Sequence, residues 1–489
     1  MKRLARWGLA ILLLAVTTNA LSLRIRAAEP VAAGPSPSGE TAEKASRWNV
    51  LLLLSDDQRP DTIGALGNPR IETPNLDDLV RRGTVFTRAT CGNPLCVTSR
   101  AELLSGLNCF RNGMLTAKRL RTDVTVWPEV MRRAGYHTWY VGKWHTSGRP
   151  STRGYEEVDG LFASGKAPAQ PQRDRHGQPV TGYVGWQFQT DDGRRMPEKG
   201  VGLTAQISAE FADAAIRFLR RRVDQPFFLH VNFTAPHDPL FLPPGFERRY
   251  TADQLPLPPN FLPQHPFDHG NLRGRDELLW PFPRTPADVR DELATYYAVI
   301  SHMDQQIGRI LETLRETGLS DKTLVIFASD QGLAIGSHGL RGKQNMYEHT
   351  INTPLVVCGP GIPADQRREA SCYLRDLFPT VCQLTGIEPP AVDGRSLVPV
   401  LRGQQDQVYP FIVGYFADSQ RMIRRGRWKL VWYPQAEREQ LFDLERDPYE
   451  IDDLSERPEQ QATRAELRSQ LKRWLREQGD PLFAEAAKT

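Results

Sequence analysis

The segment Cys96-Val97-Thr98-Ser99-Arg100 contains the residue types best suited to chemistry in this sequence. It supplies a thiol, two hydroxyls and a guanidinium, and the good helix formers of residues 101–104 follow it. We therefore expect a helix to begin here. A helix N-terminus favours anions and lowers the pKa of a thiol. The segment thus predicts an anion site with a reactive cysteine, and a buried cysteine beside a helix-capping serine is the structural alternative.

Two adjacent carboxylates, Asp56 and Asp57, follow a continuous apolar run over residues 49–54. Such a run is typical of a central strand that is buried on both faces of a sheet. Carboxylates at the end of a buried strand are costly unless a positive charge lies between them. A Ca²⁺ or Mg²⁺ ion with oxygen ligands would supply that charge, and a solvated loop is the alternative.

Three further apolar runs are also followed by polar residues. These predicted strands span residues 136–142, 227–233 and 323–329, and the polar residues after them are Lys143 and His145, His237 and Asp238, and Asp330 and Gln331. Helical patterns over residues 124–134, 204–222 and 289–317 lie between them. This alternation predicts an α/β fold with a mostly parallel central sheet and helices on both faces. Ligands bind beyond the carboxyl ends of such strands, so we expect these polar residues to form one site.

The N-terminal residues 1–28 are predicted to be a secretory signal peptide. Cationic residues precede an apolar run over residues 7–16, which is too short to span a bilayer comfortably. Residues 29–46 are rich in Ala, Pro, Gly, Ser and Glu, which is typical of a flexible linker. We therefore expect a secreted or periplasmic protein without stable membrane insertion, and an uncleaved membrane anchor is the alternative.

The composition is that of a large globular protein. The chain has 489 residues, of which 40% are hydrophobic, and this is enough for a sizeable core. A formal net charge of +4 is small for this length and argues against a nucleic-acid partner. Six cysteines are too few for a disulfide scaffold. Cys91 and Cys109, which flank Cys96, are a candidate bridge.

The chain is predicted to divide into a catalytic domain over residues 47–385 and a smaller unit over residues 386–489. In the smaller unit, residues 421–432 indicate a hairpin, and residues 462–478 indicate an amphipathic helix that packs on it. We therefore expect a C-terminal α+β subdomain with an antiparallel sheet.

The cysteine segment resembles the modification motif of the type I sulfatases of the alkaline phosphatase superfamily. That motif is Cys-x-Pro-x-Arg with a Leu-x-Gly end, and it is matched by Cys96, Arg100, Leu104 and Gly106. Thr98 stands where the family usually has proline. In that family, a formylglycine-generating or equivalent maturation enzyme oxidises the cysteine to formylglycine before folding. The aldehyde hydrate then attacks the sulfur of a sulfate ester.

The resemblance extends from Asn49 to about Ser455 and implies roles for the separated polar residues. For Ca²⁺, with Mg²⁺ less favoured, it implies the ligand set Asp56, Asp57, Cys96, Asp330 and Gln331. For catalysis it implies Cys96, Arg100, Lys143, His145, His237 and Lys343, and among these Lys143, His237 and Lys343 would contact the substrate.

Other polar residues are assigned from their place in the sequence. His338 follows the strand that ends at the metal residues, so we expect it to face the substrate, with a structural role as the alternative. His302 and His349 are expected to be structural. Asp304, within a predicted helix, is expected to accept hydrogen bonds from an N–H group or an arginine.

The resemblance implies a sulfuric ester hydrolase that acts on a sulfated small molecule or saccharide. Secretion and two long insertions with basic and aromatic residues, 160–200 and 239–286, favour a sulfated carbohydrate, with aryl sulfates as surrogate substrates. An ordinary surface excursion is the alternative for these insertions. A phosphodiesterase or phosphonate monoester hydrolase of the same superfamily would use a similar site. A non-catalytic carbohydrate-binding relative would result if Thr98 prevents modification of Cys96.

Overall fold

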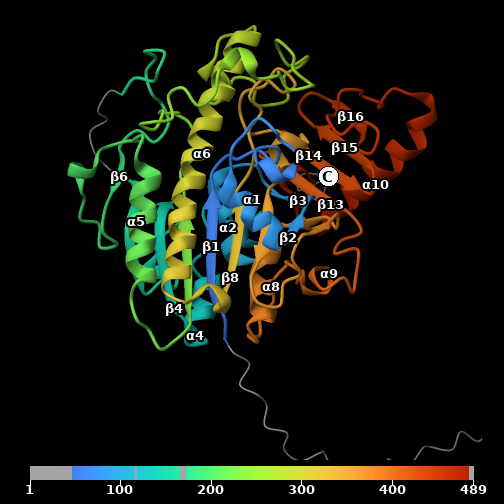
Figure 1. Cartoon of the computed structure of the whole chain (residues 1–489). Coiled ribbons are helices and arrows are strands. Elements are labelled where there is room, and N and C mark those ends of the chain that lie inside the picture. The colour runs from blue at the N-terminus through green and yellow to red at the C-terminus, as the bar shows by residue number, and fades with distance from the viewer. Residues whose placement is uncertain (1–46, 116–117, 166–171, 484–489) are drawn as a thin grey trace, which may run out of the picture. The chain divides into compact units, whose positions relative to one another are not determined.

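Strand β1 (Asn49–Ser55) lies inside a nine-stranded sheet, between β7 (Phe227–Asn232) and β8 (Thr323–Ser329). The computed structural model describes residues 47–115, 118–165 and 172–483. In it, β1 pairs in parallel with both neighbours, and all its residues are buried, as its apolar run predicts. The strand order is β11-β2-β10-β8-β1-β7-β4-β5-β6 (Figure 1).

The sheet is mostly parallel, as predicted, with β6 and β10 running against the other strands. The remaining strands are β2 (Gly83–Phe86), β4 (His137–Trp144), β5 (Glu157–Ser164), β6 (Trp186–Phe188), β10 (Leu355–Cys358) and β11 (Gln366–Arg368). Strands β5 and β6 come largely from residues 160–200, which the sequence suggests are an insertion. This segment instead supplies one edge of the sheet.

Helices cover both faces of the sheet, which confirms the predicted α/β architecture (Figure 1). The face that carries Leu51 and Leu53 packs against α1 (Pro74–Arg82), α5 (Ile207–Leu219) and α6 (Pro286–Glu316). The face that carries Leu52 and Leu54 packs against α2 (Cys96–Ser105), α4 (Trp127–Arg133) and α8 (Leu377–Leu384). The shorter helices are α3 (Cys109–Asn112), α7 (Glu348–Ile351) and α9 (Val398–Leu401).

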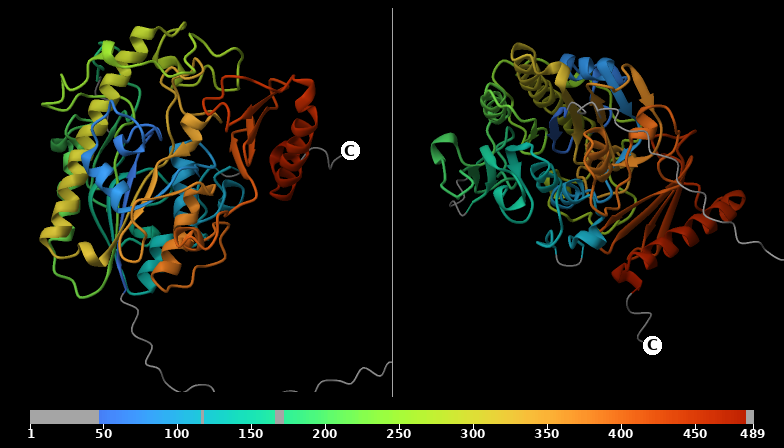
Figure 2. Two further views of the ribbon diagram at one scale, coloured as in Figure 1. Left: turned by 45° about the vertical axis from the view of Figure 1, so that its right-hand side comes forward. Right: turned by 90° about the horizontal axis from the view of Figure 1, so that it is seen from below.

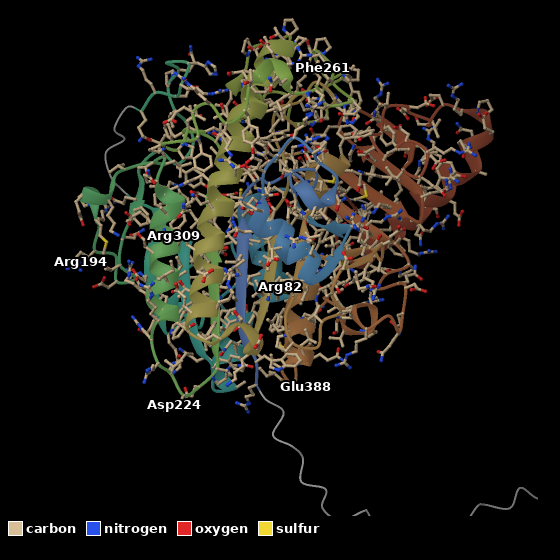
Figure 3. The ribbon with its side chains drawn as sticks, in the orientation of Figure 1. Arg82, Arg194, Asp224, Phe261, Arg309 and Glu388 are labelled. Carbon is tan, nitrogen blue, oxygen red and sulfur yellow. The ribbon has the colours of Figure 1, made fainter. Side chains whose placement is uncertain are left out.

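The carboxyl ends of the parallel strands meet at one end of the sheet. Asp224 lies just before β7. Figure 3 shows Asp224 at one end of the molecule and Phe261 at the opposite end. Phe261 also forms a β-bridge with Ser337, which follows β8. The insertion over residues 239–286 therefore reaches the end of the sheet at which the site residues are expected.

A second sheet is antiparallel, in the order β13-β14-β15-β16, and confirms the predicted C-terminal α+β architecture. Its strands are β13 (Ile412–Phe416), β14 (Gln420–Arg425), β15 (Trp428–Tyr433) and β16 (Arg438–Asp443). Helix α10 (Gln461–Glu477) packs against it, as the view from below in Figure 2 shows. A three-stranded sheet combines β3 (Ala89–Thr90), β9 (Asn352–Thr353) and β12 (Cys372–Tyr373).

All six cysteines are buried free thiols. The predicted bridge between Cys91 and Cys109 is therefore wrong. The predicted signal peptide and linker, residues 1–46, lie outside the described residues. Within the described ranges, no helix has both the length and the hydrophobicity needed to cross a membrane.

Candidate active site

The carboxyl ends of β1 and β8 bring predicted metal ligands together. Ligand atoms of Asp56, Asp57, Cys96 and Asp330 all lie within 4.8 Å of one another. The backbone N–H of Asp57 donates to Oδ1 of Asp330 at 3.1 Å, which joins the two strand ends directly. Residues separated widely in the sequence thus form one cluster, as the parallel-sheet argument predicts.

Asp57 holds its carboxylate in the cluster with an uncommon backbone conformation. Its φ is 67°, in the left-handed region, which costs a non-glycine residue about 1–3 kcal/mol. The hydroxyl of Tyr296 donates to the carbonyl oxygen of Asp57, and the N–H group of Asp57 donates to Asp330. Hydrogen bonds on both sides of the residue therefore stabilise this conformation.

Cys96 is the first residue of α2, as predicted, and only 1% of it is exposed. Its thiol lies 3.2 Å from Oδ1 of Asp56, and it accepts from Nε2 of Gln331 at 3.0 Å and Nζ of Lys343 at 3.2 Å. Burial, and next the charge of Asp56, raise the pKa of this thiol well above its ordinary range. The lowering expected at a helix N-terminus is therefore wrong, because lost hydration and a neighbouring carboxylate outweigh the helix dipole.

Thr98 occupies the first turn of α2. Its hydroxyl lies 2.7 Å from the carbonyl oxygen of Leu95 and 2.9 Å from Oδ1 of Asn93. The threonine thus bonds to the loop before the helix, which a proline at this position would not do.

Arg100 lies one turn beyond Cys96 and binds two strand ends. Its Nε donates to Oδ2 of Asp330 at 2.9 Å, and its Nη1 donates to Oδ1 of Asn232 at 2.9 Å. Burial alone would lower the pKa of Arg100, but Asp330 and Asp56 raise it. Its guanidinium is therefore a fixed positive charge inside the cluster.

Two lysines contact the carboxylates that follow β1. Lys143 forms an ion pair with Oδ2 of Asp56, and Lys343 Nζ donates to Oδ2 of Asp57 at 2.7 Å. Burial would raise the pKa of Asp56, but Lys143 and other cations hold it well below its usual value. Burial would lower the pKa of Lys343, but Asp57 and other anions raise it well above its usual value. The carboxylate of Asp56 and the ammonium of Lys343 are therefore charged.

The residues present fit a divalent cation. Burial raises the pKa of Asp57 to about 7, and the charges of Asp56 and Asp330 act in the same direction. Gln331 donates through Nε2 to Oδ1 of Asp57 at 2.5 Å, and its buried Oε1 has no hydrogen-bond partner among the described residues. Several crowded carboxylates and an unpaired amide carbonyl are the oxygen ligands that Ca²⁺ takes in proteins.

His237 and His145 lie beside this cluster. His237 Nε2 is 3.7 Å from Oδ2 of Asp57, and its Nδ1 is 2.6 Å from the carbonyl oxygen of Asp238. Burial lowers the pKa of His237 to about 4. Burial, and next the charge of Lys143, lower the pKa of His145 to about 2, and its buried Nδ1 has no partner among the described residues. Both imidazoles are therefore neutral near neutral pH.

His338 makes its contacts elsewhere. Its Nε2 lies 3.0 Å from Nδ2 of Asn260, and its ring stacks on Tyr347 at a centroid distance of 3.8 Å. The ring of His349 also lies against Tyr347, at 5.8 Å. These contacts do not support a substrate-binding role for His338, which stays a prediction, and they agree with a structural role for His349.

Three residues of the site were not among those predicted. Tyr183 donates its hydroxyl to Oδ2 of Asp56 at 2.6 Å, Asn232 accepts from Arg100, and Ser99 donates to the carbonyl oxygen of Asp330 at 2.7 Å. Asn232 lies near the carboxyl end of the predicted strand over residues 227–233, and Ser99 lies within the cysteine segment, so their positions were available signals. Tyr183 lies in a segment without periodicity and gave no such signal.

A cavity of about 440 Å³ opens beside His145. Its lining includes Val97, which follows Cys96, together with Trp186, Arg149 and Gln189. The rings of His145 and Trp186 are perpendicular, with centroids 5.2 Å apart. The cavity therefore offers an aromatic ring and planar polar groups next to the cluster.

Known proteins resemble the chain in both sequence and fold. The family model "Sulfatase" matches residues 48–387, and the model "N-sulphoglucosamine sulphohydrolase, C-terminal" matches residues 336–478. An arylsulfatase of Clostridium perfringens is 30% identical over 440 residues, which cover 83% of this chain and 90% of that protein. An N-acetylgalactosamine-6-sulfatase of Canis lupus familiaris is 30% identical over 414 residues, which cover 78% and 71% of the two chains.

Among solved structures, a phosphonate monoester hydrolase of Agrobacterium radiobacter aligns with a TM-score of 0.72 and 24% identity. The alignment covers 88% of this chain and 96% of that chain. This likeness concerns the fold and extends over nearly all of the solved chain.

Proposed function

This chain belongs to the sulfatase family of sulfuric ester hydrolases, and from that premise we propose that it is a secreted or periplasmic enzyme that hydrolyses sulfate monoesters on a sulfated carbohydrate. The proposal includes a formylglycine made from Cys96 and a bound calcium ion. The observation that carries it is the position of Cys96 Sγ, which contacts Asp56, Gln331 and Lys343 at the buried start of α2.

The charges around position 96 suit an anionic ester. Arg100, Lys143 and Lys343 are buried cations at the cluster, so they can stabilise the sulfuryl oxygens and the charge that grows on the leaving oxygen. Asp56, Asp57, Asp330 and Gln331 would hold the calcium ion. When bound, it would act as a Lewis acid and neutralise part of the negative charge.

Proton transfer would use groups of the chain already in place. The oxidised residue 96 would supply a hydrated aldehyde, one oxygen of which displaces the alcohol from sulfur. Asp330 would accept the proton of that oxygen. Lys343, which is charged, or His237 once it has been protonated would give a proton to the leaving alcohol. His145 would take the proton of the second hydroxyl, which allows sulfate to leave and the aldehyde to form again.

The cavity beside His145 supports a carbohydrate as the alcohol part of the substrate. Trp186 offers an aromatic surface, and Arg149 and Gln189 offer planar hydrogen-bonding groups to a sugar ring. The name of one relative, N-acetylgalactosamine-6-sulfatase, also refers to a sulfated sugar.

A phosphonate monoester or phosphodiester hydrolase is the second candidate, because the fold aligns with a phosphonate monoester hydrolase over most of both chains. To separate the two, the protein should be produced together with a formylglycine-generating enzyme. An aryl sulfate, an aryl phosphodiester and an aryl phosphonate are then assayed in parallel, and the peptide that contains residue 96 is examined by mass spectrometry.

We expect an aldehyde at residue 96 and a higher kcat/KM for the aryl sulfate than for either phosphorus ester. Faster hydrolysis of a phosphorus ester would support the second candidate. An unmodified thiol without hydrolysis of any ester would support a non-catalytic carbohydrate-binding protein.

A further inference from the structure

The two carboxylate oxygens of Asp56 have different surroundings. Oδ1 lies 3.2 Å from the sulfur of Cys96. Oδ2 contacts Lys143 and accepts from the hydroxyl of Tyr183 at 2.6 Å. Oδ1 thus faces residue 96, whereas Oδ2 is held by two hydrogen-bond donors.

Packing fixes the ring of Tyr183 in this place. Its centroid lies 5.1 Å from Nζ of Lys143, and its ring meets His237 edge to face at 4.7 Å. On its other side it meets Trp186 at 5.0 Å, a residue that lines the cavity. Tyr183 is 7% exposed, so its hydroxyl has few alternatives to Asp56. The ring therefore lies between the cavity wall and two predicted catalytic residues.

The backbone also fixes the position of Tyr183, whose φ is 56°. The preceding residue, Gly182, lies so close to Asp238 and Arg275 that an added Cβ would be 2.8 Å from Oδ2 of Asp238 and 2.5 Å from Nη2 of Arg275. Asp238 adjoins His237. The turn that presents Tyr183 is thus packed directly against another part of the site.

We propose that Tyr183 is a positioning residue: its hydroxyl holds Oδ2 of Asp56 and thereby directs Oδ1 toward residue 96 and the cation. Groups that hydrogen-bond to metal ligands orient them, and removing one typically weakens metal binding by about 10–100-fold. The inference rests on the proposed function, because it assigns Tyr183 a role toward the proposed calcium ligand Asp56. It adds to the site a residue from the edge of the sheet.

The test is calcium binding by Tyr183→Phe, which removes the hydroxyl and keeps the ring. Wild-type and variant proteins are stripped of metal with a chelator and titrated with calcium chloride by calorimetry. Tyr433→Phe is the matched control, because Tyr433 is also buried and donates its hydroxyl to Gln440 at 2.8 Å in the second sheet. Circular dichroism of the metal-free proteins establishes that each is folded. Tyr183→Met, which also removes the hydroxyl, is used if the phenylalanine variant does not fold.

We expect the Kd for calcium to rise by about tenfold or more in Tyr183→Phe and to stay near the wild-type value in Tyr433→Phe. A calcium Kd in Tyr183→Phe equal to that of the wild type would overturn the positioning role and leave the sulfatase proposal intact. Equal weakening in both variants would also overturn it. A wild-type protein that hydrolyses aryl sulfate without binding calcium would overturn this role together with the proposed metal.

Discussion

The carboxylate of Glu102 accepts a hydrogen bond from the hydroxyl of Tyr415, and this contact joins α2, the helix that begins at Cys96, to β13 of the second sheet. Glu102 also accepts from Nη1 of Arg375 at 2.9 Å and from the N–H of Cys109 at 3.1 Å. The second sheet therefore helps to hold the helix that begins at Cys96.

Replacing Glu102 by Ala should lower the free energy of unfolding by about 3–5 kcal/mol, because the buried Arg375 would lose its charge partner. Urea unfolding followed by circular dichroism measures this change. Glu456→Ala is the control, since Glu456 pairs with Arg464 at the surface and its loss should cost about 1 kcal/mol or less. Similar losses in the two variants would show that the buried network does not stabilise α2.

When the protein is produced with a formylglycine-generating enzyme, turnover of aryl sulfate should be abolished in Cys96→Ser and in Cys96→Ala. Neither the serine hydroxyl nor the alanine methyl group can then supply an aldehyde hydrate. Cys358→Ser is the control: Cys358 is another buried thiol, which donates to the carbonyl oxygen of Arg82 at 3.4 Å, and serine can keep that bond. Steady-state kinetics give the comparison. Substantial activity in Cys96→Ala would rule out the proposed nucleophile.

Chelation should remove both activity and stability. Calcium at about 100 times its Kd is expected to stabilise the folded protein by about 2.7 kcal/mol, so the Tm should fall after treatment with a chelator. Addition of Ca²⁺ should restore Tm and activity more fully than Mg²⁺, because crowded carboxylates with an amide oxygen suit the larger ion. In Asp330→Asn, calcium should raise the Tm less than in the wild type. A Tm that does not respond to the chelator or to calcium would contradict the proposed metal site.

Trp186→Ala should reduce kcat/KM for a sulfated saccharide more strongly than for a small aryl sulfate. Loss of the aromatic surface is expected to cost the saccharide about 1–3 kcal/mol, which corresponds to about 5–150-fold. Arg149→Gln should also lower the ratio of kcat/KM for the saccharide to kcat/KM for the aryl sulfate. Arg194→Gln is the control, because Arg194 lies on the outer edge of the molecule and does not line the cavity (Figure 3). An unchanged ratio in Trp186→Ala would place the saccharide elsewhere.

Asp304 should make stability depend on pH. It lies on α6 and caps α1, because its Oδ1 accepts from the N–H of Leu76 at 2.7 Å and its Oδ2 accepts from Nδ2 of Asn75 at 2.9 Å. Burial raises its pKa to about 6 from the ordinary value of 3.8. The folded state thus binds this proton more tightly than the unfolded state. The stability that Asp304 contributes is complete at a pH below the pKa that Asp304 has in the unfolded state. It is lost as the pH rises through the pKa that Asp304 has in the folded state.

The free energy of unfolding of the wild type, relative to Asp304→Asn, should therefore fall by roughly 2 kcal/mol between about pH 4 and pH 7. Urea unfolding of both proteins across that range measures the difference. A difference that is constant with pH, or that grows as the pH rises, would contradict the assigned protonation. The hydrogen bonds of Asp304 agree with the role expected from its place in the sequence.

The parts of the site that the sequence predicts share one physical basis. The apolar run before Asp56 and the run before Asp330 both indicate buried strands. The carboxyl ends of parallel strands must meet, so the cluster was predictable from the sequence alone. Cys96 at a helix start was also predictable from the residue types that follow it. The thiol's raised pKa was not, because it depends on burial and on a carboxylate from another strand.

The side-chain contacts that sequence reasoning could not predict depend on long-range packing. Tyr183 reaches Asp56 because a glycine turn packs against Asp238, and no local periodicity encodes that approach. The segment that supplies Tyr183 has too few regular apolar positions to predict the edge strands β5 and β6. His338 follows a strand that ends at the site, but a backbone with φ 54° and stacking on Tyr347 place its ring in another cluster.

The burial of Cys96 also sets an order of events during synthesis. Lys343, which covers the sulfur, lies 247 residues after it in the chain. At about 5–20 residues per second, the ribosome needs roughly 12–50 s to add that length. Until then the thiol environment is incomplete, so under the proposed function a maturation enzyme would have that interval to reach residue 96 on the nascent chain. A slower translation rate downstream of Cys96 would lengthen the interval and, under the same proposal, raise the fraction of chains that acquire the aldehyde.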